Sequence, residues 1–258
     1  MTPTPPLYLL HTQPDARLLA AWVARHHARH ARQSADVGDA LHGLLRAAFG
    51  ANAPQPFCYL GEAQGLLAYT PLDAPAMATQ VALAEPLAAK TLGLGACSHH
   101  DGYRLRPFPT QWASGQELGF EVRVRPTVRG AQGEQDAFLH AVAQAGGKEG
   151  APVDRQAVYA QWLREHLALR EGISPQPWQA AVELLDVQLS AFSRSKTVRR
   201  TQASAEQGRK GHASDGPDAT LRGRLRITDP TAFAHLLARG VGRHRAFGFG
   251  MLLLQRAG

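Results

Sequence analysis

The sequence predicts an α+β fold, and three observations support that prediction. Hydrophobic residues make up 44% of the 258-residue chain, enough for one large domain or two of ordinary size. Short apolar runs typical of strands are interspersed with longer runs typical of helices. The second half holds helices, a strand, a helix and a closing strand. A degenerate second copy of the first half would have this order, although no repeat is visible in the sequence.

The first half begins with one strand and two helices. The apolar stretch at 6–11 predicts the strand, and residues 14–33 predict a long helix with one apolar side. The polar segment at 34–39 interrupts that helix and offers capping residues for another. Residues 40–50 predict the second helix, which ends at its terminal glycine.

Four further strands are predicted before residue 130. The stretches 56–61 and 64–71 are joined by a turn that contains glycine, as in a hairpin. Residues 77–87 and 116–129 are interpreted as two more strands, and the second of them alternates apolar with charged residues. A ferredoxin-like α+β sandwich fits this order of elements.

The second half is predicted to be helical at first and then mixed. Helices are expected at 154–170 and 175–192. A strand at 221–229, a helix at 230–240 and a closing strand at 245–255 follow.

The chain is strongly basic, with a formal net charge of +7 and an isoelectric point near 9.9. Arginines make up 24 of the 28 basic residues, and the planar guanidinium suits phosphate groups and base edges. This composition favours a polyanionic partner. A codon bias towards arginine and alanine is the alternative explanation.

Several protein classes are disfavoured. The cysteines Cys58 and Cys97 belong to no Cys-x-x-Cys pair, which argues against a disulfide framework and a cysteine-based zinc site. His26 and His30 have helical spacing but no evident third ligand, so we expect no metal and no cofactor. No run approaches roughly 18 apolar residues, so no membrane partner is expected. Residues 1–10 lack the features of a signal peptide, so we expect a cytoplasmic protein.

Most of the positive charge lies between residues 194 and 226. This segment carries +6 of the net +7, and its middle is polar and glycine-rich, which predicts a mobile loop or an extended hairpin. Nucleic acid is the favoured partner, and an ordinary solvated insertion is the alternative. The basic residues of the segment are Arg194, Lys196, Arg199, Arg200, Arg209, Lys210, Arg222, Arg224 and Arg226.

A second unusual stretch, ARGVGRHRAFGFGMLLLQ, spans 238–255. Glycines surround the cationic triplet Arg243, His244 and Arg245, and an apolar run follows. Glycine lets a backbone approach a ligand closely, and successive free N–H groups can bind an anion. The stretch therefore predicts a phosphate held beside a sheet, and a glycine-rich hairpin that is basic by chance is the alternative.

Three blocks of the sequence, at 39–50, 125–129 and 222–254, together resemble CRISPR endoribonucleases that process repeat RNA. The similarity is to the CasE type of type I-E systems and to its type IV counterpart. The C-terminal block resembles the family pattern of a helix, G-x-G-x-x-basic-x-x-G-x-G and an apolar strand. An additional arginine- and histidine-rich helix at 25–32, and Asp39 where CasE proteins tend to have tyrosine, favour the type IV counterpart.

The resemblance implies two tandem ferredoxin-like (RRM-like) domains, which we place at 1–130 and 131–258. The second would contain the helical insertion, the basic loop at 194–226 and the glycine-rich loop at 240–250. The resemblance also implies binding of a CRISPR repeat hairpin and metal-independent cleavage at its 3′ base. The 2′-hydroxyl would attack the neighbouring phosphate and leave a 2′,3′-cyclic phosphate and a 5′-hydroxyl. The protein would then stay on the crRNA with other Cas subunits of an effector complex.

His42 matches the catalytic histidine of the resembling family. On a helix, Leu41, Leu44 and Leu45 would form the buried stripe, while His42 and Arg46 would share another face with Asp39. Histidine titrates near neutral pH and can transfer a proton, and Arg46 could stabilise charge on the phosphate. Catalysis by arginines is the alternative, with Arg25, Arg29 and Arg243 as candidates.

RNA binding is assigned to arginine-rich strands and loops, because A-form RNA is recognised largely through its shape and phosphates. A non-catalytic subunit that caps the crRNA hairpin, and a general nucleic-acid-binding protein, are the competing interpretations. The predicted RNA-binding residues are Arg29, Arg123, Arg125, Arg129, Arg194, Lys196, Arg199, Arg200, Arg209, Lys210, Gly242, His244 and Arg245.

Overall fold

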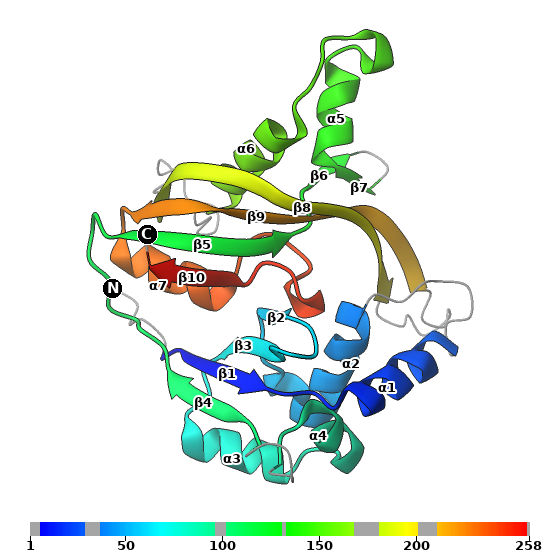
Figure 1. Ribbon diagram of the computed structural model, residues 1–258, viewed down its shortest axis with the longest axis vertical. Coiled ribbons are helices and arrows are strands. Elements are labelled where there is room, and N and C mark those ends of the chain that lie inside the picture. The colour runs from blue at the N-terminus through cyan, green and yellow to red at the C-terminus, as the bar shows by residue number, and fades with distance from the viewer. Residues whose placement is uncertain are drawn as a thin grey trace, which may run out of the picture.

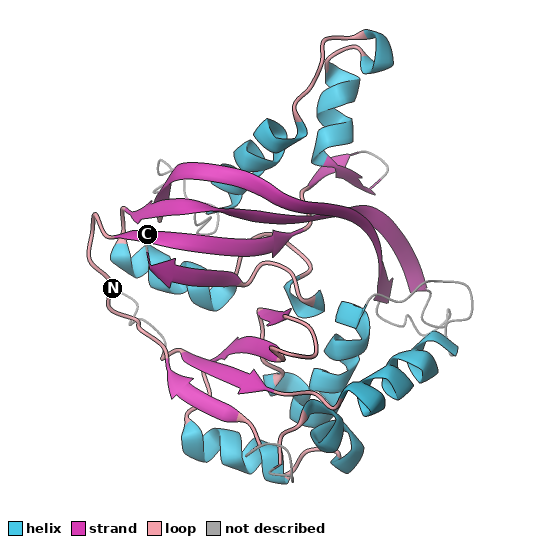
Figure 2. Ribbon diagram, in the orientation of Figure 1, coloured by secondary structure: helices cyan, strands magenta, loops and turns pink. Residues whose placement is uncertain are grey.

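The computed structural model describes residues 6–28, 37–95, 102–130, 133–167, 181–200 and 211–256. The chain forms two four-stranded antiparallel sheets, which lie one above the other in Figure 1. Figure 2 shows helices on both sheets and a helical extension that projects from the upper one. The α+β prediction is therefore confirmed. Within the described ranges, no helix is long and apolar enough to cross a membrane.

The first sheet has the strand order β2-β3-β1-β4. This is the order of a ferredoxin-like sheet, in which the first strand of the unit lies between the fourth and the third. The first strand, the 56–61 strand and the 64–71 strand of the sequence analysis are all confirmed. The strands are β1 (Tyr8–Thr12), β2 (Phe57–Tyr59), β3 (Leu66–Thr70) and β4 (Arg104–Pro107).

The central strands β1 and β3 of the first sheet are covered on both faces. Leu10 and Ala68 contribute to a core under the helices, while Leu9 and Tyr69 point into the core of the second unit. The Tyr69 hydroxyl donates a 3.0 Å hydrogen bond to the carbonyl of Leu252, which joins the two units. The helices that follow β1 and β3 are α1 (Ala16–Ala28), α2 (Val37–Phe49), α3 (Ala74–Ala82) and α4 (Pro86–Leu92), and η1 (Gly50–Asn52) follows α2.

The strand predicted at 77–87 is wrong, because this stretch belongs to α3 and α4. The side chain of Asp73 accepts a hydrogen bond from the amide of Ala76, and the Glu85 carboxylate accepts from two amides of the next turn. Each cap is followed within two residues by a proline in the first helical turn, where proline is tolerated. These start signals outweigh the apolar residues that indicated a strand.

The second sheet has the order β10-β5-β9-β8, which repeats the arrangement of the first. The predicted second copy is thus confirmed at the level of fold. Helix α7 packs against β3 of the first sheet. The elements are β5 (Glu117–Val124), β6 (Thr127–Gly130), β7 (Gly133–Asp136), α5 (Ala137–Gln144), η2 (Gly147–Glu149), α6 (Arg155–Leu167), β8 (Val182–Arg200), β9 (Gly211–Ile227), α7 (Pro230–Arg239), η3 (Arg245–Phe247) and β10 (Leu252–Arg256).

Strand β5 opens the second unit, since it pairs with β9 and β10. The sequence analysis had counted this strand with the first half and divided the chain at residue 130. We propose instead a domain boundary between β4 and β5. The first unit would then contain the complete first sheet, and the second unit would contain all four strands of the second.

The helix predicted at 175–192 is wrong from residue 182 onwards, where β8 begins; residues 175–180 lie outside the described residues. The register of β8 shifts between Leu184 and Asp186 and again between Leu189 and Ala191. Each such bulge adds a residue and breaks the two-residue alternation of a strand. The apolar residues then recur at three- and four-residue spacings, which indicated a helix.

The extended hairpin considered for 194–226 is confirmed in its described parts. Strands β8 and β9 pair from Val182 opposite Ile227 to Arg200 opposite Gly211. Figure 1 shows that the far ends of both strands pass beyond β5 and bend towards the side of the molecule that carries α1 and α2. The closing strand is shorter than predicted, because residues 245–247 form η3 and β10 begins at Leu252.

Candidate active site

Helix α2 presents His42 and Arg46 on one side. Leu41, Leu44 and Leu45 are buried beneath it, as the helical spacing predicted, while His42 is half-buried and Arg46 is exposed. Asp39, which was predicted on the face of His42 and Arg46, is buried near the start of the helix.

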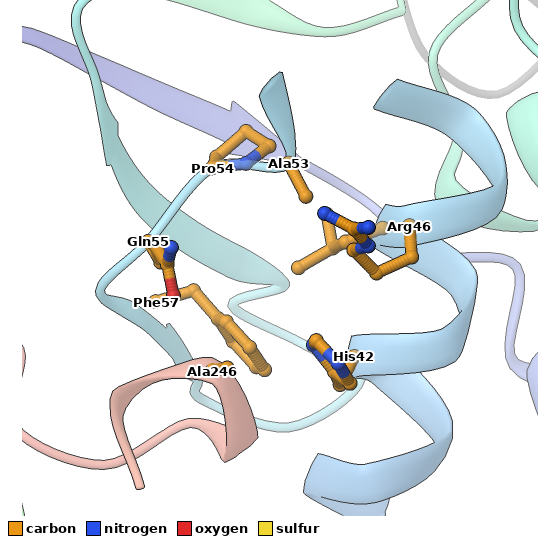
Figure 3. A pocket seen from close by; sticks show the side chains of 8 residues that line it. His42, Arg46, Ala53, Pro54, Gln55, Phe57 and Ala246 are labelled. Carbon is orange, nitrogen blue, oxygen red and sulfur yellow. The ribbon is translucent and has the colours of Figure 1, made fainter. Parts of the chain in front are cut away.

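His42 and Arg46 line a small pocket of about 40 Å³. Figure 3 shows both side chains projecting from α2 towards the segment that precedes β2, with Ala246 of the glycine-rich loop on another wall. An imidazole and a guanidinium thus open into the same pocket, where one can transfer a proton and the other can bind an anion. The lining residues are His42, Leu45, Arg46, Ala53, Pro54, Gln55, Phe57 and Ala246.

The glycine-rich loop packs directly on the catalytic candidate. The ring centroids of His42 and Phe247 are 5.1 Å apart at an interplanar angle of 53°, a tilted aromatic contact. The fold therefore unites two stretches of the sequence that had been selected for different reasons. Phe247 was missed by the sequence analysis, although an aromatic residue within a glycine-rich run was a usable signal.

The glycines of this loop serve close packing within the protein. Gly240, Gly242, Gly248 and Gly250 all have positive φ, between 68° and 83°. A Cβ atom on Gly242 would lie 2.7 Å from Cη2 of Trp162, so the backbone of this residue faces an indole ring. Contact of Gly242 with an RNA phosphate stays a prediction, and the packing on Trp162 is a second reason for glycine at this position.

The cationic triplet is largely engaged with the protein. Nη1 of Arg243 donates to Glu134 at 2.9 Å, and Nε2 of His244 lies 2.7 Å from the other oxygen of the same carboxylate. The hydrogen bond from His244, together with Arg243, lowers the pKa of Glu134 to about 2, although burial opposes this shift. Arg245 donates to the carbonyl of Arg239 at 2.5 Å. The buried His244 side chain is not placed to bind RNA, whereas 47% of the surface of the Arg243 side chain is exposed.

Two of the alternative catalytic arginines, Arg25 and Arg243, do not line the pocket. Arg25 is exposed on α1, where its Nε approaches the carbonyl of Ala21 at 3.4 Å and its guanidinium lies 5.9 Å from the Trp22 ring. Arg29 lies outside the described residues. Arg243 is directed to Glu134, as described above.

The arginines near β5 have three different environments. Arg123 donates two hydrogen bonds to Asp218, at 2.8 and 2.5 Å. Arg125 was predicted to face RNA from the polar side of the strand, but it is 1% exposed and donates to the carbonyl and hydroxyl of Ser195. Arg129 is exposed on β6.

Within the basic segment, several arginines are paired with acids of adjacent strands. Arg224 donates to Asp186 at 2.6 Å, and Arg226 binds Glu117 at 2.8 Å and Glu183 at 2.9 Å. Arg222 pairs with Glu121 and Arg194 with Asp215. Lys196, Arg199 and Arg200 lie on the distal part of β8, of which the backbone alone is described, and Arg209 and Lys210 lie outside the described residues.

In the described part of the chain, no group of three or more histidine, cysteine, aspartate or glutamate side chains could hold a metal ion. Of the predicted histidine pair, His30 lies outside that part. The titratable and cationic side chains that line the pocket are the imidazole of His42 and the guanidinium of Arg46.

Comparisons with known proteins agree with this fold. The family model described as CRISPR associated protein matches residues 7–256. No curated protein matches the sequence. One structure of the CRISPR endoribonuclease Cse3 bound to a 19-nucleotide RNA has a TM-score of 0.55 at 17% identity, over 98% of this chain and 99% of that chain.

Two further structures are similar to the same extent. Another structure of Cse3 with the 19-nucleotide RNA has a TM-score of 0.53 at 19% identity, over 97% of this chain and 99% of that one. Cse3 of Thermus thermophilus, bound to an RNA representing a pre-cleavage complex, has a TM-score of 0.53 at 18% identity over 96% and 98%. The chain therefore shares the fold of these proteins over almost its full length.

Proposed function

Because this chain belongs to the CRISPR-associated protein family, we propose that it is an endoribonuclease that processes precursor crRNA. It binds the repeat hairpin, cleaves at the 3′ base of the hairpin and stays on the mature crRNA as a subunit of an effector complex. The similarity of fold to Cse3, which has been seen bound to RNA, supports this proposal.

The observation that carries the proposal is the pocket between α2 and the glycine-rich loop. It combines His42, held by an aromatic contact, with the exposed Arg46, one helical turn away. Fixed geometry is a large part of catalysis, and the Phe247 ring restricts where the imidazole of His42 can point.

The proposed reaction needs a base and a positive charge. His42 accepts the proton of the 2′-hydroxyl as the 2′-oxygen bonds to phosphorus. The bond from phosphorus to the 5′-oxygen breaks, and that oxygen takes a proton from water. Arg46 stabilises the charge that develops on the phosphate oxygens. The products are a 2′,3′-cyclic phosphate and a 5′-hydroxyl, and no step requires a metal ion.

We favour the type IV counterpart of the CasE type for this chain. The support is the arginine- and histidine-rich stretch that extends beyond α1, together with Asp39 three residues before His42. In this structure Asp39 is buried in the first turn of α2 and does not line the pocket.

The test uses purified protein and the repeat RNA of its host in EDTA, with and without a 2′-deoxy substitution at the cut site. We expect two defined fragments from the all-ribose RNA and none from the deoxy RNA, because the deoxy RNA lacks the nucleophile. Binding without cleavage of either RNA would overturn the assignment as an enzyme and favour a subunit that caps the crRNA hairpin. A scrambled hairpin, bound equally well at moderate salt, would indicate a general nucleic-acid-binding protein.

A further inference from the structure

We propose that Glu134 is a positioning residue, which holds the glycine-rich loop in the shape that seats Phe247 against His42. The inference deepens the proposed function and rests on it. Glu134 lies on β7, in the small β6–β7 hairpin that is inserted between β5 and β8. It therefore belongs to none of the elements that line the pocket.

The Glu134 carboxylate contacts two consecutive residues of the glycine-rich loop. One carboxylate oxygen accepts from Arg243 at 2.9 Å, and the other lies 2.7 Å from Nε2 of His244. Only 14% of the Glu134 side chain and 3% of the His244 side chain are exposed. Hydrogen bonds to a partly buried carboxylate are stronger than their solvent-exposed counterparts, so this contact is suited to fixing a conformation.

The conformation of His244 shows that the loop is constrained at this point. His244 has φ of 61°, a left-handed conformation, and no other non-glycine residue in the described ranges has positive φ. Such conformations are costly outside glycine and persist where surrounding contacts hold them. The contact with Glu134 is such a constraint, because it holds the side chain of His244, the residue whose backbone has the left-handed conformation.

A short series of contacts leads from His244 to the catalytic candidate. The amide of Phe247 donates to the carbonyl of His244 at 2.8 Å, which closes the η3 turn. The Phe247 ring lies 6.1 Å from the His244 ring and 5.1 Å from the His42 ring, measured between centroids. Releasing His244 would thus free the turn that carries Ala246, which lines the pocket, and Phe247, which contacts the ring of His42.

The ends of the loop are fixed independently of Glu134. The amide of Gly250 donates to the carbonyl of Arg123 at 2.7 Å, and the amide of Val241 donates to the carbonyl of Gly250 at 2.8 Å. Loss of the Glu134 carboxylate should therefore disturb the turn at 243–247 without detaching the loop. This separation makes the role of Glu134 testable.

The first test compares Glu134→Ala, Glu134→Gln and Glu183→Ala in single-turnover cleavage at saturating RNA and in hairpin binding. Glu183 matches the loss of charge, because its exposed carboxylate pairs with Arg226 on the second sheet. We expect Glu134→Ala to slow cleavage about 10- to 100-fold, the scale of a misplaced catalytic group. Its Kd should not weaken, because loss of an acidic group favours RNA binding. Glu134→Gln, which keeps the shape and an acceptor, should recover part of the rate.

The second test measures the environment of the His42 ring by NMR and does not depend on cleavage activity. The ring signals of His42 in NMR spectra depend on the nearby Phe247 ring, so Glu134→Ala and Phe247→Ala should shift them similarly, and Glu183→Ala should leave them in place. Unmoved His42 signals, or an unchanged cleavage rate in Glu134→Ala, would overturn the positioning role while leaving the proposed endoribonuclease intact. If the wild-type protein does not cleave, the proposed function fails, and the His42 shift still decides whether Glu134 sets the geometry of this pocket.

Discussion

The β9 arginine ladder (Arg222, Arg224 and Arg226) and the α2 pocket both contain arginine, but they differ in whether a carboxylate pairs with it. Each ladder arginine has a carboxylate partner on β5 or β8. Arg46 is exposed, and no described residue forms a hydrogen bond or ion pair with it. Positive charge is therefore largely neutralised on the open sheet and remains available beside His42.

This difference shows why charge counted along a sequence is a weak guide to an RNA surface. The segment 194–226 has a large excess of basic residues, but its acidic partners Glu117, Glu121, Glu183 and Asp186 lie outside it. Exposed pairs of this kind contribute little to stability, but they lower the local potential that would attract a phosphate. The RNA-binding role of the segment should therefore reside in its distal part.

The largest effect is expected at the pocket. His42→Ala should slow cleavage about 100- to 10,000-fold, because loss of a general base has an effect on this scale. Hairpin affinity should stay nearly unchanged, since the imidazole acts in the chemical step. His140→Ala on α5, which does not line the pocket, is the control. Cleavage by His42→Ala at the wild-type rate would move the assignment to the arginines.

The next effect compares Arg46 with the ladder directly. Arg46→Ala should slow cleavage about 100-fold if its guanidinium stabilises the transition state. Arg224→Ala removes an equal charge from a position where Asp186 already neutralises it, and should leave the rate unchanged. Equal cleavage rates for the two variants in single-turnover assays would contradict the conclusion that the charge of Arg46 is available to the RNA and that of Arg224 is neutralised.

The sequence predicted the parts of the site that local periodicity controls. The apolar stripe of α2 placed His42 and Arg46 on the outer side of that helix, and the structure agrees. The resemblance to the family selected His42, and no local pattern would have done so. Helix α7 and the β2–β3 hairpin were also predictable, because a capping aspartate with proline and a glycine turn define their boundaries.

The parts that could not be predicted depend on partners distant in sequence. Glu134 and His244 are 110 residues apart, and nothing in either neighbourhood indicates their contact. Arg125 follows an alternating strand and was assigned to its polar face, yet the chain turns after Val124 and buries the guanidinium beside Ser195. In both cases tertiary contacts, rather than local preference, determine where the side chain lies.

A smaller effect is expected from a substitution that makes the glycine-rich loop clash with Trp162. Gly242→Ala combines a left-handed φ of 68° with a Cβ 2.7 Å from the indole, and should destabilise the protein by about 2 kcal/mol. Gly61→Ala has a φ of 89° but open space around its Cβ, and should cost about 1 kcal/mol. Thermal unfolding without RNA measures both. A loss of RNA binding by Gly242→Ala at unchanged stability would instead support the original RNA-contact prediction.

The smallest effect separates the two ends of the β8–β9 hairpin. Arg199 and Arg200 lie on the distal part of β8. This part of the strand bends towards the side of the molecule that carries α1 and α2 (Figure 1). Arg222 and Arg224 belong to the β9 arginine ladder, where each pairs with a carboxylate. Arg199→Ala with Arg200→Ala should reduce the slope of log affinity against log salt by about 2, as loss of two phosphate contacts would. Arg222→Ala with Arg224→Ala should leave the slope unchanged, since carboxylates already occupy these arginines. Titrations of the repeat RNA hairpin at several salt concentrations measure both slopes. A lower slope for the Arg222 and Arg224 variant alone would place the RNA on the open sheet instead of at the distal part of the β8–β9 hairpin.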